Sequence, residues 1–206
     1  DRSCSAGRFR QVGNISAINI ARYNGQRWYP LGEGLRARDV YAMAGDGRDL
    51  FVAGEISIAG QVAVGNLARW LMVEEEWRPM KEFNSVVRAL ALVGNRLFVG
   101  GDFSLAGILP AGAMAQTEVQ PGGEVHWAAV GGGVQGSIHA MRFVNGCIYV
   151  GGRFDSVADR EGTKSARNVA RWCLQDSAEF GEVWEPVLGM RGAGGQILAI
   201  AEALVE

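Results

Sequence analysis

Few residues in this sequence have the chemistry of a reactive site. The chain has two histidines, His126 and His139, and three cysteines. A zinc site needs three or four closely spaced His, Cys or carboxylate ligands, and these residues do not supply such a set. Neither a Gly-x-Ser-x-Gly nucleophile elbow nor a phosphate-binding glycine loop occurs in the sequence. We therefore predict no catalytic residues and no cofactor.

One acidic segment invites comparison with calcium sites. Asp155, Asp159 and Glu161 share a single predicted loop, and a hard cation such as Ca²⁺ needs several carboxylate oxygens. Their spacing matches no EF-hand loop, and Arg160 and Lys164 interrupt the acidic residues. The three carboxylates are candidate ligands, but we predict that the chain has no metal site.

The remainder of the sequence is organised as a fourfold repeat. One motif, Asn-x-Ala-Arg-aromatic in its full form, recurs with starts 47, 47 and 55 residues apart: Asn19–Tyr23, Asn66–Trp70, Ala113–Thr117 and Asn168–Trp172. A second motif recurs in register with the first: Phe51–Gly54, Phe98–Gly101 and Tyr149–Gly152. Short apolar runs broken by glycine, at a period near 50 residues, are typical of the blades of a β-propeller.

Each repeat is predicted to contain four short strands. The first carries alanines at alternate positions, in the segments Val40–Ala44, Val87–Ala91, Ile138–Arg142 and Ile197–Ala201. Because small side chains suit the crowded axis of a propeller, we place this strand innermost. The two motifs form the second and third strands. The fourth strand, outermost, carries a tryptophan that we expect to be buried between neighbouring blades: Trp28, Trp77, Trp127 and Trp184.

The predicted fold class is all-β. It is a β-propeller with four repeats of about 47 to 59 residues, four antiparallel strands in each, and less than about 5% helix. A single domain is expected over residues 1–206. Its repeats are predicted at 1–39, 40–86, 87–137 and 138–196, and residues 197–206 form a final inner strand. The strands fit a closed four-bladed ring, in which Ile197–Ala201 pairs with Cys4–Phe9, and they fit an arc of a larger ring equally well.

The repeated polar residues are interpreted as architecture. Asn19, Asn66 and Asn168 stand where a long loop re-enters the sheet, and asparagine side chains commonly bond their own backbone at such places. The arginines three residues later, Arg22, Arg69 and Arg171, can pack their stems over a tryptophan and pair with a backbone carbonyl or an acid. A binding site rarely needs the same residue in every repeat.

Cys147 and Cys173 lie on the second and third strands of one repeat. If their hairpin is centred on the loop Asp155–Arg167, the two cysteines are about opposite each other, and we expect their Cα atoms within about 7 Å. A disulfide there fits an oxidising compartment.

The loops sort onto two faces of the predicted fold. The two-to-three loop has nine residues in the first three repeats and is longer in the fourth, whereas the three-to-four loop differs in every repeat. Because loops that vary on a fixed frame commonly carry recognition, we predict that a partner docks on the three-to-four face. The residues that mark this face are Asn24, Glu75, Gln120 and Ser177.

The order of these motifs resembles a known family. Asn-Ile-Ala-Arg-Trp, Trp-x-x-Leu-Gly-x-Gly, Val-x-Ala-Leu and Leu-Tyr-Val-Gly-Gly-x-Phe are similar to the propeller repeats of large secreted or surface-anchored bacterial proteins and of fungal cortical polarity markers. The resemblance covers Gly7 to Ala201 and is weakest at Ala113, Gln116 and Thr117. It implies an extracellular interaction module and no catalytic residues.

Composition narrows the expected partners. The net charge is −2, with both signs dispersed along the chain, so nucleic acid is not expected. No apolar run reaches the roughly 20 residues that span a bilayer. The leading hypothesis is a non-enzymatic extracellular or cell-surface propeller that binds a protein or a glycan. The alternatives are a catalytic propeller, a hydrolase or lyase with carboxylates at its pore, and a purely structural spacer of a larger surface protein.

Overall fold

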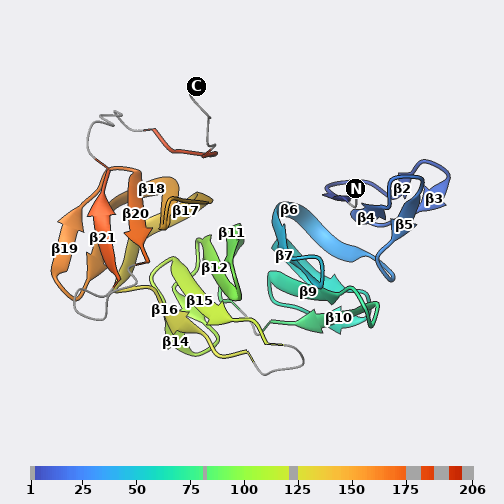
Figure 1. Ribbon diagram of the computed structural model, residues 1–206, viewed down its shortest axis with the longest axis horizontal. Helices are drawn as coiled ribbons and strands as arrows, with labels where there is room; N and C mark the ends of the chain where they lie inside the picture. Colours follow the sequence, from blue (N-terminus) through green and yellow to red (C-terminus); the bar gives the residue numbers. More distant parts are fainter. Residues whose placement is uncertain (1–2, 81–82, 121–124, 175–181, 188–194, 201–206) are drawn as a thin grey trace. The chain divides into compact units, whose positions relative to one another are not determined.

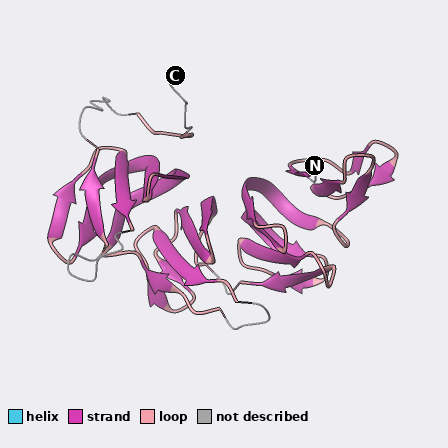
Figure 2. Ribbon diagram, viewed as in Figure 1, coloured by secondary structure: helices cyan, strands magenta, loops and turns pink. Residues whose placement is uncertain are grey.

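The computed structural model describes residues 3–80, 83–120, 125–174, 182–187 and 195–200. These residues form β-strands, turns and coil, and no helix occurs among them, as the sequence predicted (Figure 2). Within this part of the chain there is accordingly no helix long and apolar enough to cross a membrane. The chain divides into two compact units, Asp1–Val87 and Arg88–Glu206, and each is described by itself.

The first unit holds two antiparallel sheets and a small hairpin (Figure 1). The three-stranded sheet has the order β1-β4-β5, formed by Ser3–Ala6, Ile20–Tyr23 and Trp28–Pro30. The larger sheet has the order β10-β9-β7-β6, formed by Glu76–Pro79, Leu67–Leu71, Asp49–Ala59 and Leu35–Gly45, and β8 (Val62–Ala63) pairs with β7. The hairpin joins β2 (Gln11–Val12) to β3 (Ile15–Ser16).

The second unit repeats the same plan. One sheet has the order β11-β12-β15-β16, formed by Val87–Val93, Arg96–Gly101, Met114–Glu118 and Ala128–Ala129. The other has the order β17-β18-β20-β21, formed by Gly133–Val144, Cys147–Asp159, Val169–Cys173 and Val183–Pro186, and β19 (Gly162–Ser165) pairs with β18. A small hairpin joins β13 (Leu105–Ala106) to β14 (Leu109–Pro110). The predicted order of four strands per repeat is thus confirmed for the last three repeats.

The two-to-three connections are not plain loops, which corrects the sequence-based description. Each contains a short hairpin: β2 with β3, β7 with β8, β13 with β14, and β18 with β19. In the fourth repeat, β18 continues to Asp159 and β19 pairs with it, so the predicted loop from Asp155 to Arg167 is largely strand. A closed hairpin of fixed geometry explains why this connection keeps nine residues in three of the repeats.

The first residue of the Asn-x-Ala-Arg motif, just before the third strand, closes each of these hairpins with its backbone hydrogen bonds. It has a left-handed backbone in all four repeats: φ is 63° at Asn19, 73° at Asn66, 59° at Ala113 and 66° at Asn168. Its carbonyl accepts a bond of 3.0–3.1 Å from Gly7, Gly54, Gly101 or Gly152, and its N–H donates to Phe9, Ile56, Phe103 or Phe154. We call this arrangement the asparagine clamp.

In three repeats the asparagine side chain extends the clamp to the segment that follows. The side-chain Nδ2 donates to a backbone carbonyl at 2.7–3.0 Å: Asn19 to Leu35, Asn66 to Ser85, and Asn168 to Gly195. The amide therefore bonds the start of the following first strand or its counterpart, rather than only its own neighbourhood as predicted. Asn is well suited here because it tolerates the left-handed conformation better than most residues.

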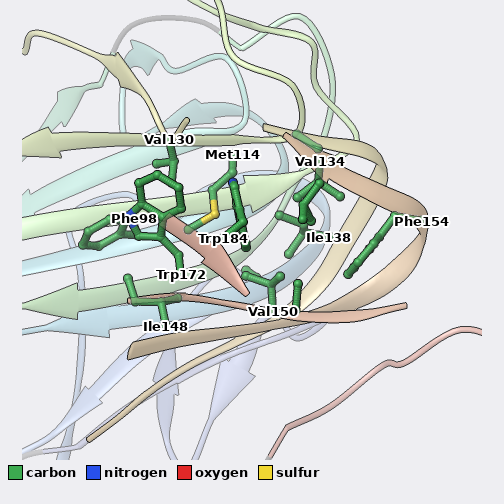
Figure 3. Packing of buried hydrophobic residues seen from close by; sticks show 14 of the residues in the cluster. Phe98, Met114, Val130, Val134, Ile138, Ile148, Val150, Phe154, Trp172 and Trp184 are labelled. Carbon is green, nitrogen blue, oxygen red and sulfur yellow. The ribbon is translucent and has the colours of Figure 1, made fainter. Parts of the chain in front are cut away.

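Paired tryptophans fill the core of each unit. Trp70 and Trp77 lie opposite each other on β9 and β10 with ring centroids 5.1 Å apart. Trp172 and Trp184 repeat this on β20 and β21 at 5.2 Å, and Figure 3 shows them beside Phe98 in the core of the second unit. Each pair packs against glycine-rich backbone, because an added Cβ would stand 3.0 Å from a ring at both Gly60 and Gly131.

The segment 195–200 is coil in the structure, and residues 201–206 lie outside the described residues. It nonetheless occupies the place of a first strand. The N–H of Ile197 donates to Gly152, and Ile197 and Ile200 pack on Gly151 as Ile138 and Met141 pack on Gly100. The predicted final inner strand, 197–206, is therefore not seen as a strand in its described part.

Removal of the Trp77 ring should be costly. The ring is 5% exposed and packs with Ile20 and Leu31 of the first repeat, and its Nε1 donates to the Leu31 carbonyl at 3.1 Å. We expect Trp77→Ala to lower the free energy of unfolding by about 3–5 kcal/mol through the cavity it leaves. Urea denaturation measures this, and a loss under about 1 kcal/mol would contradict the packing.

The asparagine clamp predicts that two substitutions change stability in opposite directions. Asn66→Ala loses the bond to Ser85 and forces alanine into the left-handed region, so it should cost about 1–3 kcal/mol. Ala113→Asn places the residue of the other three repeats at φ 59° and should raise stability by about 0.5–1 kcal/mol. Thermal denaturation of both variants tests the clamp, and destabilisation by Ala113→Asn would show that the third repeat cannot accept the amide.

Candidate functional site

The variable three-to-four connections meet the one-to-two turns at one end of each sheet. The N–H of Met72 donates to Arg48, that of Val119 to Asn95, and that of Leu174 to Gly146, at 2.7–2.9 Å. Within each of the last three repeats, these two kinds of connection therefore lie side by side, as strand alternation requires. This is the end of the sheets for which we predicted binding.

Of the four residues that mark the predicted face, two have structural roles. Asn24 closes its turn, because its Oδ1 accepts the N–H groups of Gln26 and Arg27. Glu75 adopts a left-handed backbone and forms an ion pair of 3.6 Å with Arg22. Ser177 lies outside the described residues. Gln120 is different, because it lines a cavity.

The cavity beside Gln120 has a volume of about 470 Å³. All of its lining residues but one have polar side chains, and they come from β12, β15, β16 and the three-to-four connection of the third repeat: Arg96, Gln116, Thr117, Glu118, Gln120, His126 and Ala128. We call it the third-repeat cavity. The volume falls in the usual range of ligand pockets. The lining offers hydrogen-bond donors and acceptors, and it includes one positively charged side chain, Arg96, and one negatively charged side chain, Glu118.

The cavity forms where the repeat changes its residues. In the second repeat, Asp49 on β7 pairs with Arg69 on β9 at 2.7 Å, and both side chains are buried. The corresponding residues of the third repeat are Arg96 and Gln116, and Arg96 donates to the Gln116 side chain. The donor is now on the second strand and the acceptor on the third, the reverse of the second repeat. The change to Gln116 is therefore matched by the change to Arg96, and the two side chains still bond each other.

The arginines pack differently from the prediction. None of the three repeated arginines lies over a tryptophan: Arg69 lies over Phe51 and Arg171 over Tyr149 of the second strand, and Arg22 over Tyr29 of the fourth, at 5.5–5.9 Å from the centroid. Their predicted pairing with an acid is confirmed, with Asp49, Glu185 and Glu75 respectively.

In the third repeat, Arg96 lies over Phe98 of its own strand at 5.1 Å. It also pairs with Glu182 at 2.7 Å. The guanidinium at the cavity wall is thereby held by a ring, an amide and a carboxylate.

The fourth repeat has a disulfide at the corresponding strand position. Cys147 and Cys173 are directly opposite each other on β18 and β20. Their Cα atoms are 4.0 Å apart and their sulfurs are bonded, which agrees with the predicted separation. Cys4 is a free, half-buried thiol, and burial raises its pKa although the charge of Arg22 opposes this.

The three calcium candidates do not converge. The Asp159 carboxylate accepts bonds from the N–H groups of Glu161 and Trp184 and from Lys164 Nζ, at 2.8–3.0 Å. Burial raises the pKa of Asp159, but these bonds outweigh it and lower the pKa overall. Asp159 thus anchors the hairpin of β18 and β19. In the described part of the chain, no group of three or more His, Cys, Asp or Glu residues could hold a metal ion.

A second polar cluster lies beside the first strands of the second unit. Asp102 accepts three bonds of 2.7–3.0 Å from Arg88. Burial raises the pKa of Asp102, whereas the bonds from Arg88 and Ser137 lower it, with a net lowering. Sequence reasoning assigned no acid to this region. The signal was the position directly after the second motif, which Asp102 and Glu55 both occupy. Glu55 accepts a bond from Tyr41 in the first unit.

His139 completes that cluster. Burial is the main cause that lowers its pKa, the charge of Arg88 lowers it further, and Asp102 partly offsets both. Its Nδ1 is buried, and among the described residues no hydrogen-bond partner reaches that atom. A proton there would face the Arg88 charge, so the fold favours the neutral imidazole.

Comparisons with known proteins do not assign a family. No protein-family model matches the chain, and no curated protein matches it. Among solved structures, the crystal structure of the computationally designed Ika4 protein is similar, at 16% sequence identity and a TM-score of 0.41. The similarity covers 72% of this chain and 78% of that one. Since the TM-score is below 0.5, no conclusion about fold or function rests on this similarity.

The state of His139 predicts a pH dependence. Because its folded pKa is below the ordinary value of 6.5, its contribution to stability is present above that value and is lost as pH falls below it, toward the folded pKa. We expect the melting temperature to fall between about pH 7 and pH 5, and His139→Gln to flatten this slope. An unchanged slope in the variant would show that the histidine is not responsible.

Proposed function

We propose that this chain is a non-enzymatic, extracellular or cell-surface β-propeller that binds a protein or a glycan. The observation that carries the proposal is the third-repeat cavity. It lies at the variable end of the sheet, in the repeat whose residues depart from the pattern, while the clamp and the strand order are kept. A fixed frame with a locally altered surface is how many scaffolds present a binding site.

The lining of the cavity favours a polar ligand. Arg96 and Gln120 can donate hydrogen bonds, and Glu118 and Gln120 can accept them. His126 is exposed at the rim, next to Trp127 in the sequence. Small apolar ligands are usually bound by apolar pockets, so a hydroxyl-rich sugar or a polar protein loop suits this lining better.

The catalytic alternative finds less support. The carboxylate closest to the expected role, Asp102, is paired on both oxygens with Arg88 and has a lowered pKa. A general acid needs a raised pKa near the working pH. Asp102 is therefore suited to holding the first strands in place rather than to proton transfer.

A glycan array probed with the full chain tests the proposal. We expect a defined set of sugars to bind, and the double variant Gln120→Ala/His126→Ala to weaken that binding about thirtyfold, since each of the two lost hydrogen bonds contributes roughly 1 kcal/mol. Glu74→Gln, at the exposed hairpin tip of the second repeat, is the matched control and should bind as the parent does. Equal melting temperatures show that folding is intact.

Two outcomes would contradict this assignment. Unchanged binding by the double variant would place the site elsewhere. If no glycan binds, the folded chain is cross-linked to surface proteins, and the double variant should give less cross-linked product than the parent. A chain that shows neither glycan binding nor this dependence is better described as a structural spacer.

A further inference from the structure

The first unit has a groove lined by four arginines. Its volume is about 820 Å³, and Arg8, Arg10, Arg36 and Arg38 line it together with Glu55 and Ser57. The four come from two Arg-x-Arg pairs that are far apart in the sequence. In the sequence the charges look evenly spread, so this cluster could not be predicted. The fold creates it by bringing the segment before β2 next to the start of β6 (Figure 1).

The groove is at the opposite end of the sheet from the connections considered above. Arg36 pairs with Ile58 near the far end of the β6–β7 ladder, whereas the turn joining the two strands follows Gly45. The groove belongs to the other unit and shares no lining residue with the third-repeat cavity. An inference about it does not depend on the proposed function of that cavity.

Three backbone carbonyls of the groove already accept hydrogen bonds. The carbonyls of Leu35, Arg36 and Arg38 accept bonds from the side chains of Asn19, Ser57 and Arg8 at 2.9–3.1 Å. Few backbone groups remain to rearrange when a ligand enters. Ligand binding should therefore cost little backbone entropy, and the entropy lost is mainly that of the arginine side chains.

Two of the arginines are committed and two are available. Arg8 makes a bidentate pair with Asp39 at 2.7 and 2.8 Å, and Arg38 pairs with Glu55 at 3.5 Å. Arg10 and Arg36 are exposed, and within the described residues no hydrogen bond or ion pair of either side chain is found. Four guanidiniums against two carboxylates leave this surface positive on a chain whose net charge is −2.

We propose that this arginine groove binds an acidic polysaccharide, one that carries carboxylate or sulfate groups. Guanidinium forks match both groups in bidentate geometry. The Glu55 carboxylate and the Ser57 hydroxyl can accept hydrogen bonds from sugar hydroxyls, a function they could not serve toward the phosphates of DNA. The lining contains no aromatic side chain, whereas sites for single-stranded nucleic acid usually stack bases on aromatic rings.

Isothermal titration of the full chain tests the proposal with four probes: polygalacturonate, dextran sulfate, neutral dextran and poly(dT). We expect binding to one or both acidic polysaccharides and none to neutral dextran. The two acidic probes separate a carboxylate-bearing ligand from a sulfated one. Arg10→Gln/Arg36→Gln should weaken the binding about tenfold, because each change removes a charge-assisted contact.

The matched control removes the same net charge elsewhere. Arg153 and Arg160 are exposed arginines of the second unit, and Arg153→Gln/Arg160→Gln should change the affinity by less than about twofold, since distant exposed charges are screened. Arg10→Lys/Arg36→Lys keeps the charge without the fork and should give an intermediate affinity. It also provides a test if the glutamine variant does not fold. The variant Gln120→Ala/His126→Ala should bind as the parent does, which separates this site from the third-repeat cavity.

Several results would overturn the proposal. These are no binding to either acidic polysaccharide, equal weakening by the groove variant and its charge-matched control, or binding of neutral dextran with similar affinity that the groove variant weakens to the same extent. Binding of poly(dT) as tight as that of the polysaccharides, at the same ionic strength, would instead identify a nucleic-acid site.

Discussion

The left-handed residue at the start of each third strand is the constraint on which the fold depends. Through its own N–H and C=O it closes the short hairpin that separates the second strand from the third. Through its side chain, in three of four repeats, it also bonds the segment that follows the fourth strand. One residue thus fixes three pieces of chain. Ala113 shows that the backbone part survives without the amide, because its two backbone bonds keep the usual lengths.

The sequence predicted the features that recur locally. Strand order and the opposition of Cys147 and Cys173 follow from antiparallel register, which sequence spacing determines once a hairpin is centred. The predicted burial of the fourth-strand tryptophan is confirmed for Trp77 and Trp184. It is wrong for Trp28 and Trp127, which are only half-buried, and Trp127 precedes β16 rather than lying in it. The short hairpins escaped prediction because strands such as β2 and β13 have two residues each, too few to show a period. The partners of Asp102 and Glu55 were also not predicted. Both pairs span the hairpin of the first and second strands, so their opposition follows from register as that of the cysteines does, but we applied register only to the cysteines.

The third repeat shows how the architecture tolerates chemical change. Asp49 and Arg69 form a buried ion pair, and loss of one partner from such a pair usually costs several kcal/mol. The chain avoids that cost at Arg96 and Gln116 by exchanging donor and acceptor between the strands. The guanidinium still lies over the second-strand ring. Polar identity can therefore change while the strands stay in register.

The two ends of each sheet are consequently under different constraints. The clamped end has closed hairpins whose connection keeps nine residues in three of the four repeats. Variation there is therefore mainly in the side chains, and in the first unit four arginine side chains form the arginine groove. The other end has connections whose length differs in each repeat, so the backbone itself can be reshaped. A surface built only from side chains on a fixed backbone suits a repetitive ligand that is recognised by its charge. A surface built from variable connections suits a ligand that is recognised by its shape. The positions of the two proposed sites follow this division.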